Sequence, residues 1–111
     1  MSPDINAILK QLEQGITSIA ETSLKNYVSQ AEVDGKSFLT AMEDDLTQWT
    51  NLLAQGQLSP KDFQDLVLGQ KDLLQMVALK QAGLAQVQLD QFKEAVFGLV
   101  IDTVMSAIKK I

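Results

Sequence analysis

The sequence contains no cysteine, no histidine and no arginine. Without cysteine or histidine it has no thiolate nucleophile, no imidazole base and no zinc site built from nitrogen and sulfur ligands. Without arginine it lacks the planar cation that holds a phosphate or carboxylate through paired hydrogen bonds. The catalytic groups that remain are carboxylates, lysines, serines and one tyrosine, and no spacing gathers them. We therefore expect a protein that is not an enzyme and that uses no cofactor.

Proline, glycine and aromatic residues are scarce as well. The chain of 111 residues has two prolines, six glycines and 5% aromatic residues, whereas 46% of its residues are hydrophobic. This length and apolar content suffice for one modest core, and no linker-like or low-complexity stretch divides the chain. The abundance of leucine, alanine, glutamine and lysine favours helices over strands. We expect an all-α fold in a single helical domain over residues 1–111.

The charge is negative and unevenly distributed. The formal net charge is −5, and residues 1–58 hold eight acidic residues against three lysines, whereas residues 59–111 hold six of each. A negative chain lacks the cationic surface that neutralises phosphates, so we expect no nucleic-acid partner. The densest acidic run is Glu43–Asp45. Three consecutive helical residues point over about 200°, so this run does not predict a metal site.

A helix reversal is predicted at about residues 54–59. Ser59 followed by Pro60 is typical of a helix start, because the serine accepts a hydrogen bond as N-cap and the fixed φ of proline suits the first helical position. Gly56 is placed where a residue of positive φ ends the preceding helix. The Ser-Pro pair at residues 2–3 predicts a similar start for the first helix.

Apolar residues recur every three or four positions on both sides of this reversal, which is the helical period and not the alternation of a strand. The first stripe contains Ile5, Leu9, Leu12, Ile16, Ala20, Leu24, Tyr27, Ala31, Gly35, Phe38, Met42, Leu46, Trp49 and Leu53. The second contains Phe63, Val67, Gln70, Leu74, Ala78, Ala82, Ala85, Leu89, Phe92, Val96, Val100, Val104, Ala107 and Ile111. The stripes predict two antiparallel helical halves.

Antiparallel halves place residue i opposite roughly residue 114 minus i, so small residues near Ala31 and Gly35 face small residues near Ala78 and Gly83. Two architectures remain open. Unbroken helices form a hairpin of about 75 Å. Breaks near residues 34–36 and 82–83, where glycine weakens a helix, fold the hairpin into a compact four-helix bundle. Any small-molecule site is expected at this level.

The closing segment is apolar on nearly every side of a helix. Ala95–Ile108 spans about 21 Å as a helix, which is shorter than the roughly 30 Å of a bilayer's hydrocarbon core, and Asp102 lies within it. A membrane span is therefore not predicted. A helix with apolar residues all round is covered on several sides, either at the centre of a bundle or at a subunit interface.

The predicted function is that of a non-enzymatic helical protein that self-associates through its C-terminal helix, as a structural subunit or as an adaptor for another helical protein. The predicted interface residues are Phe92, Val96, Phe97, Val100, Ile101, Val104 and Ile108. The alternative is a membrane-active hairpin that releases its C-terminal segment to lipid. The sequence favours self-association over this membrane contact. No signal peptide is predicted, so the expected location is the cytoplasm by default, or outside the cell after export without a cleaved signal.

Overall fold

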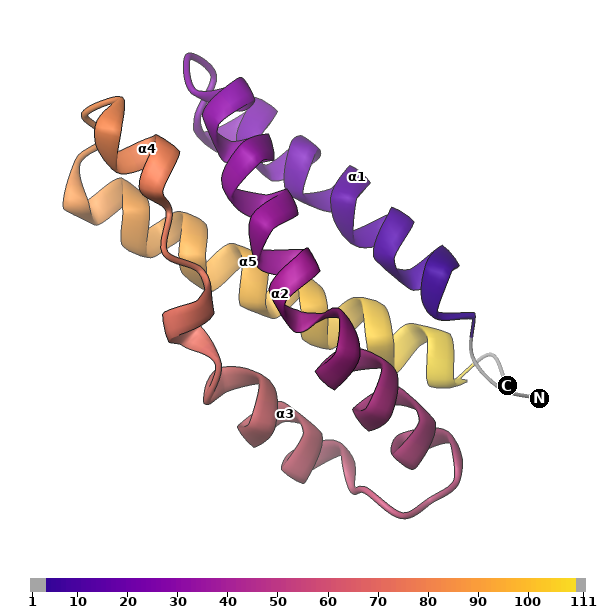
Figure 1. Cartoon of the computed structure of the whole chain (residues 1–111). Helices are drawn as coiled ribbons and strands as arrows, with labels where there is room; N and C mark the ends of the chain where they lie inside the picture. Colours follow the sequence, from indigo (N-terminus) through magenta and orange to yellow (C-terminus); the bar gives the residue numbers. More distant parts are fainter. Residues whose placement is uncertain (1–3, 110–111) are drawn as a thin grey trace.

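The computed structural model describes residues 4–109, and every regular element in that range is helical (Figure 1). The elements are α1 (Ile5–Ser23), α2 (Val28–Ala54), α3 (Pro60–Leu68), the 3₁₀ helix η1 (Lys71–Leu73), α4 (Val77–Gln81) and α5 (Gln86–Lys109). The all-α prediction is confirmed.

The chain crosses the molecule four times, and successive segments run antiparallel (Figure 1). The first segment is α1, the second is α2, the third consists of α3, η1 and α4, and the fourth is α5. α1 packs against α2 and α5, while α2 packs against α4 and α3. The molecule measures 43 × 23 × 19 Å with a radius of gyration of 14.0 Å, close to the roughly 13 Å expected of a compact domain of this size. Of the two predicted architectures, the compact four-helix bundle is therefore correct.

The predicted reversal at residues 54–59 is confirmed. α2 ends at Ala54, and Gly56 adopts a φ of 74°. The Gly56 N–H donates to the carbonyl of Leu53 (3.1 Å) and the Gln57 N–H donates to that of Leu52 (2.9 Å). These two bonds form a Schellman motif, which satisfies carbonyl groups at the end of the helix and requires positive φ at the glycine.

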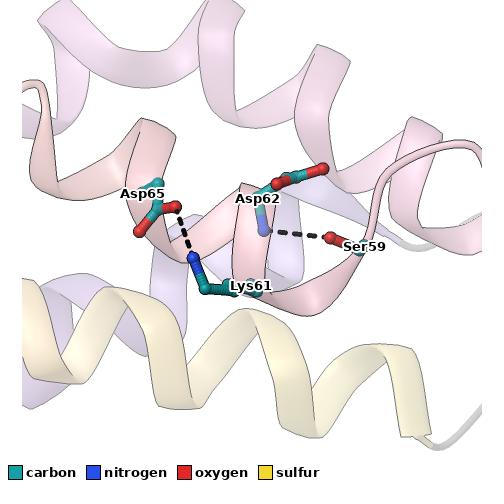
Figure 2. A network of polar contacts seen from close by, with 4 residues as sticks. All are labelled: Ser59, Lys61, Asp62 and Asp65. Carbon is teal, nitrogen blue, oxygen red and sulfur yellow. Dashed lines mark hydrogen bonds and ion pairs between the residues drawn. The ribbon is translucent and has the colours of Figure 1, made fainter.

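α3 begins as predicted, with Ser59 as N-cap and Pro60 as its first residue. The Ser59 hydroxyl oxygen accepts a hydrogen bond from the N–H of Asp62 at 3.0 Å (Figure 2). On the outer side of the same helix, Lys61 and Asp65 form an exposed ion pair at 3.4 Å (Figure 2). An exposed ion pair of this spacing contributes only a few tenths of a kcal/mol. The hydrogen bond of the Ser59 cap therefore stabilises the start of α3 more than the ion pair does.

The predicted break at residues 82–83 is also confirmed. α4 ends at Gln81, and Gly83 has a φ of 89°. The Leu84 N–H donates to the carbonyl of Leu79 (3.2 Å), which gives this turn the same Schellman geometry as the central reversal. The chain then enters α5 at Gln86.

The predicted break at residues 34–36 is wrong, because α2 runs through this range without interruption. Gly35 is buried, and a Cβ atom added to it would lie 2.7 Å from Cγ2 of Ile16 on α1. The glycine therefore allows α1 to approach α2 closely and does not end a helix.

The first half breaks instead at residues 24–27. Leu24 is buried and Tyr27 is partly buried, while Lys25 and Asn26 between them are exposed. The Leu24 N–H donates to the carbonyl of Ala20 (2.7 Å), which closes the last turn of α1. Two anchored side chains around an exposed pair reverse the chain without glycine or proline.

The start of α1 differs in detail from its prediction. Asp4 is the N-cap, and its Oδ1 accepts from the N–H groups of Asn6 (3.1 Å) and Ala7 (3.3 Å). The predicted Ser-Pro start at residues 2–3 lies outside the described residues. An aspartate is an N-cap as effective as serine, so the predicted chemistry is met by a neighbouring residue.

The core follows the first stripe closely and the second stripe only in part. Between residues 70 and 85 the second stripe is wrong at four of its five positions and right only at Leu74: Gln70 and Ala78 are partly exposed, and Ala82 and Ala85 are exposed. The core positions in this stretch are Leu74, Met76, Leu79 and Leu84. A stripe of constant period requires one continuous helix, whereas the chain here passes through η1 and α4, so the phase of its side chains changes.

Candidate interaction surfaces

Five of the seven predicted interface residues lie in the interior of the chain's own bundle. Buried there are Phe92, Val96, Phe97, Val100 and Val104. The ring of Phe97 packs against that of Phe38 on α2, with centroids 5.1 Å apart and planes tilted by 54°. Ile101 and Ile108 remain partly exposed. α5 contacts α1, α2 and α3, so the expected covering on several sides is provided by the chain itself.

A second row of apolar residues remains on α5 beyond the buried ones. Gly98, Ile101, Met105 and Ile108 follow one another in steps of three, four and three residues, and we call this row the outer face of α5. Gly98 is exposed, and a Cβ atom added to it would meet nothing within 4 Å. The other three residues are partly exposed. The step pattern is that of a seam between packed helices, and the glycine leaves room for a close neighbour.

Exposed charged residues flank this row at intervals. Glu94 precedes it, Asp102 lies within the same stretch and Lys109 follows it. An apolar strip with a charged rim is the usual composition of a protein interface, with the apolar part at its centre.

A buried carboxylate organises a different part of the surface, where α2 meets α4. Asp34 is only 6% exposed. Its Oδ1 accepts a hydrogen bond from the N–H of Ala78 (3.0 Å), and its Oδ2 accepts one from the N–H of Leu79 (2.8 Å). Asp34 thus caps the N-terminus of α4 from a different helix and satisfies two donors that would otherwise lack partners.

The residue before α4 explains why the cap comes from elsewhere. Met76 takes the N-cap position with φ 55° and ψ 42°, and its side chain makes no capping bond. It is the one residue other than glycine with positive φ between residues 4 and 109. A left-handed conformation is unfavourable for a residue with a Cβ atom, so surrounding contacts must hold it. The Met76 side chain is buried, which provides such contacts.

Two open hollows flank Val77, the first residue of α4. One hollow, of about 370 Å³, lies against α2 and includes Val33, Met76 and Ala78 in its lining. The other, of about 430 Å³, includes Lys80 and Lys93. Val33 and Val77 are 58% and 53% exposed, and they are two of the four large apolar side chains exposed among the described residues. We call Val33, Leu73, Met76 and Val77, with the two hollows, the α4 surface.

A third hollow, of about 420 Å³, lies between α1 and α2 beside Gly35, at the level where a small-molecule site was expected. Glu13, Glu32 and Lys36 line it, and the hydroxyl of Thr17 donates to Oε2 of Glu32 at 3.3 Å. These groups offer mixed charge without a nucleophile and base in contact. Within residues 4–109, no three acidic side chains come together as a metal site would require.

Sequence reasoning anticipated part of one surface and missed the other. Ile101 and Ile108 on the outer face of α5 were predicted interface residues. The α4 surface was missed because Val33 and Val77 fall outside both apolar stripes. The residue that could have indicated this surface is Asp34, an acidic residue next to the apolar stripe of a helix. In the sequence, Asp34 and Gly35 were interpreted as a break in that helix.

No helix in residues 4–109 combines the length and the hydropathy that crossing a membrane requires. Comparison of the chain with protein-family models, with curated proteins and with solved structures yields no match.

Proposed function

We propose that this protein is a non-enzymatic helical subunit or adaptor that self-associates through the outer face of α5. The observation that carries the proposal is the row of Ile101, Met105 and Ile108, which remains partly exposed after the bundle has formed. Five of the seven residues first expected at the interface are already covered, so the interface is narrower than the sequence suggests.

The energetics of this face favour association. Fully covering a large aliphatic side chain contributes about 1.5–3 kcal/mol, and these three side chains, which the bundle already covers by more than half, retain the smaller part of that gain. Gly98 at one end has open space before it, so the backbone of a second helix can approach closely there. Soluble chains most often associate as twofold dimers, in which the same face is used on both copies.

The test is the substitution Ile101→Asp. A carboxylate at the centre of the outer face must be desolvated on association, so we expect the variant to have the mass of one chain, 12.2 kDa, where the wild type has a multiple of it. Light scattering measures the mass and circular dichroism the helicity, which we expect to change little because Ile101 is not fully buried.

The matched control is Ser106→Asp. Ser106 is exposed on the same helix and lies about 140° around it from Ile101, so the same charge is added away from the outer face. Its mass should equal that of the wild type. A wild type that remains a single chain at all concentrations, or an Ile101→Asp variant of unchanged mass, contradicts the proposal.

The alternative proposal is a membrane-active protein that releases α5 to lipid. It requires Phe92, Val96 and Phe97, which are buried, to leave the core. The cost of exposing them to water must then be offset by lipid, as in helices that bind a membrane surface. Co-sedimentation with neutral and anionic vesicles, combined with dye release, separates the two proposals. Vesicle binding with leakage would favour this alternative.

A further inference from the structure

We propose that two copies of the chain pair through the outer face of α5 with their two α5 helices antiparallel. This inference rests on the proposed self-association and goes beyond it, because it specifies how the second copy is oriented and which residues meet. Three properties of α5 favour this orientation: the sign of the charge at each end of the outer face, the open space at Gly98, and one register that satisfies both.

The outer face of α5 is negative at its start and positive at its end. Glu94 lies four residues before Gly98 and is exposed, and so is Lys109 at the end of the helix. Lys109 lies within about 20° of Gly98 around the helix, so it belongs to the same face. Asp90, one turn before Glu94, is also exposed and adds to the negative start. Lys93 lies about 140° from Gly98, on the side of α5 that packs against the bundle.

This distribution of charge favours an antiparallel pair. In a parallel twofold pair, Glu94 faces the partner's Glu94 and Lys109 faces the partner's Lys109, so like charges meet at both ends. In an antiparallel pair, Lys109 of each copy lies opposite Glu94 of the other, and the attraction occurs twice. The dipoles of the two helices are also better aligned when antiparallel. Asp102 lies at the rim near the middle of the face, at about the level of its own copy in either orientation, so it does not distinguish them.

The open space at Gly98 favours the same orientation. A Cβ atom added to Gly98 would meet nothing within 4 Å, whereas Met105 on the same face has a long, partly exposed side chain. In a parallel pair, glycine faces glycine and leaves a gap, while two Met105 side chains crowd at one level. In an antiparallel pair, Met105 of each copy can fill the space at Gly98 of the other, and the flexible thioether side chain suits such a gap.

One register satisfies both requirements. If Glu94 lies opposite Lys109, residue i lies opposite residue 203 minus i, and Gly98 then lies opposite Met105. Charge and shape are independent properties, yet they select the same register. The twofold axis of this pair passes close to Ile101, so the two copies of this residue lie near each other at the centre of the interface.

The first experiment is disulfide crosslinking. The chain contains no cysteine, so an introduced cysteine is its one thiol and reports proximity. An equimolar mixture of Glu94→Cys and Lys109→Cys should form mainly the mixed dimer under mild oxidation, whereas each variant alone should stay largely uncrosslinked. The mixed dimer keeps the native Glu94–Lys109 pair at its other end. Mass spectrometry distinguishes the mixed dimer from the two homodimers.

The second experiment exchanges the charges. Glu94→Lys and Lys109→Glu should each raise the dissociation constant about fivefold or more in sedimentation equilibrium, although they change the net charge in opposite directions. The double variant exchanges the two charges and should return to within about twofold of the wild type. Glu43→Lys and Lys25→Glu make the same changes in net charge at exposed positions outside α5, and they should also stay within about twofold. Circular dichroism should be unchanged throughout, because all four side chains are exposed.

A third variant uses an exposed valine. Val87 is 66% exposed and lies seven residues before Glu94, so it extends the outer face towards the start of α5. In a parallel pair it would face its own copy, whereas in the antiparallel register it lies opposite no residue of the partner's α5. Val87→Asp should therefore keep the dissociation constant of the wild type.

A parallel pair would overturn the proposal. Each cysteine variant would then crosslink with itself, each single charge reversal would leave the dissociation constant near that of the wild type, and Val87→Asp would weaken association. Self-association through the outer face would still stand in that case. A wild type that remains a single chain at all concentrations would overturn both proposals, so the two failures are distinguishable.

Discussion

At the scale of single residues, Asp34 and Gly35 show how one dipeptide can serve two neighbours. The Asp34 carboxylate caps α4, while the absence of a side chain at Gly35 admits Ile16 of α1. Both residues are unusual inside a helix, and their sequence alone predicts a local break. Their role is tertiary, since each satisfies a requirement of a helix distant along the chain.

We predict that Asp34→Ala lowers the free energy of unfolding by about 2 kcal/mol. The substitution leaves the N–H groups of Ala78 and Leu79 without an acceptor in a partly or fully buried place, which costs about 1–3 kcal/mol. Asp34→Asn keeps one acceptor oxygen, so its free energy of unfolding should lie between those of the wild type and Asp34→Ala. Urea unfolding followed by circular dichroism measures the effect. The control Asp44→Ala, at an exposed position of the same helix, should change stability by less than about 0.5 kcal/mol.

A pair of glycine substitutions tests the packing at Gly35. Gly35→Ala places a methyl group 2.7 Å from a buried isoleucine and should destabilise the bundle by about 1–3 kcal/mol. Gly98→Ala adds the same group to open space in the interior of a helix and should stabilise it by about 0.5–1 kcal/mol. Both are measured at concentrations where the mass is that of one chain. Equal effects of the two substitutions would mean that α1 does not approach α2 at Gly35.

At the scale of elements, the helix ends that could be predicted are those with a local chemical signal. Gly56 and Gly83 have positive φ, and the Ser59 hydroxyl accepts a backbone hydrogen bond. These requirements are met by few residue types, so the sequence reveals them. The turn at residues 24–27 depends on which side chains reach the core, as does the irregular stretch at 69–76. Such turns leave no comparable mark in the sequence.

The same distinction explains what could be predicted of the surfaces. The helical period identified Ile101 and Ile108 among the apolar residues of α5. It does not tell which apolar residues of that helix are buried by the chain's own α1, α2 and α3. The α4 surface arises because η1 and α4 shift the phase of the side chains between residues 70 and 85. A continuous stripe cannot anticipate that shift.

We predict that Ser59→Ala lowers the free energy of unfolding by about 1 kcal/mol, because the N–H of Asp62 loses its acceptor at the start of α3. Ser59→Asp should restore most of that loss, since aspartate is an equally good N-cap. Thermal unfolding measures both variants. Ser106→Ala serves as the control at an exposed serine inside a helix, and it should not destabilise the protein.

At the scale of the whole molecule, the bundle is a hairpin folded double. The predicted pairing of residue i with roughly residue 114 minus i holds at two separate levels: Asp34 binds the backbone of Leu79, and the side chain of Leu99 lies against Gly15. Folding the hairpin over moves its two ends but keeps each half beside the other. The pairing of the two halves was therefore predictable, whereas the sequence left the long hairpin and the compact bundle both open and misplaced one break by about ten residues.

The molecular dimensions provide a further prediction. Small-angle scattering from the single chain should give a radius of gyration near the 14.0 Å of the Cα trace, slightly enlarged by side chains and hydration. If the wild type associates at the concentrations required, the Ile101→Asp variant serves instead. An unbroken hairpin would have a longest dimension of about 75 Å, against 43 Å for the bundle, so the distance distribution decides between them.

The paired halves also indicate an order of folding. When contacts form outward from the turn at residues 54–59, each new pair closes only a short additional loop, and the entropy lost per step is small. Direct pairing of α1 with α5 from the unfolded chain closes a loop of nearly the whole sequence and is slower. The chain can therefore close progressively from its middle, with the contact of Gly15 and Leu99 among the last to form, and the two ends of the described chain are the parts expected to separate first when it unfolds.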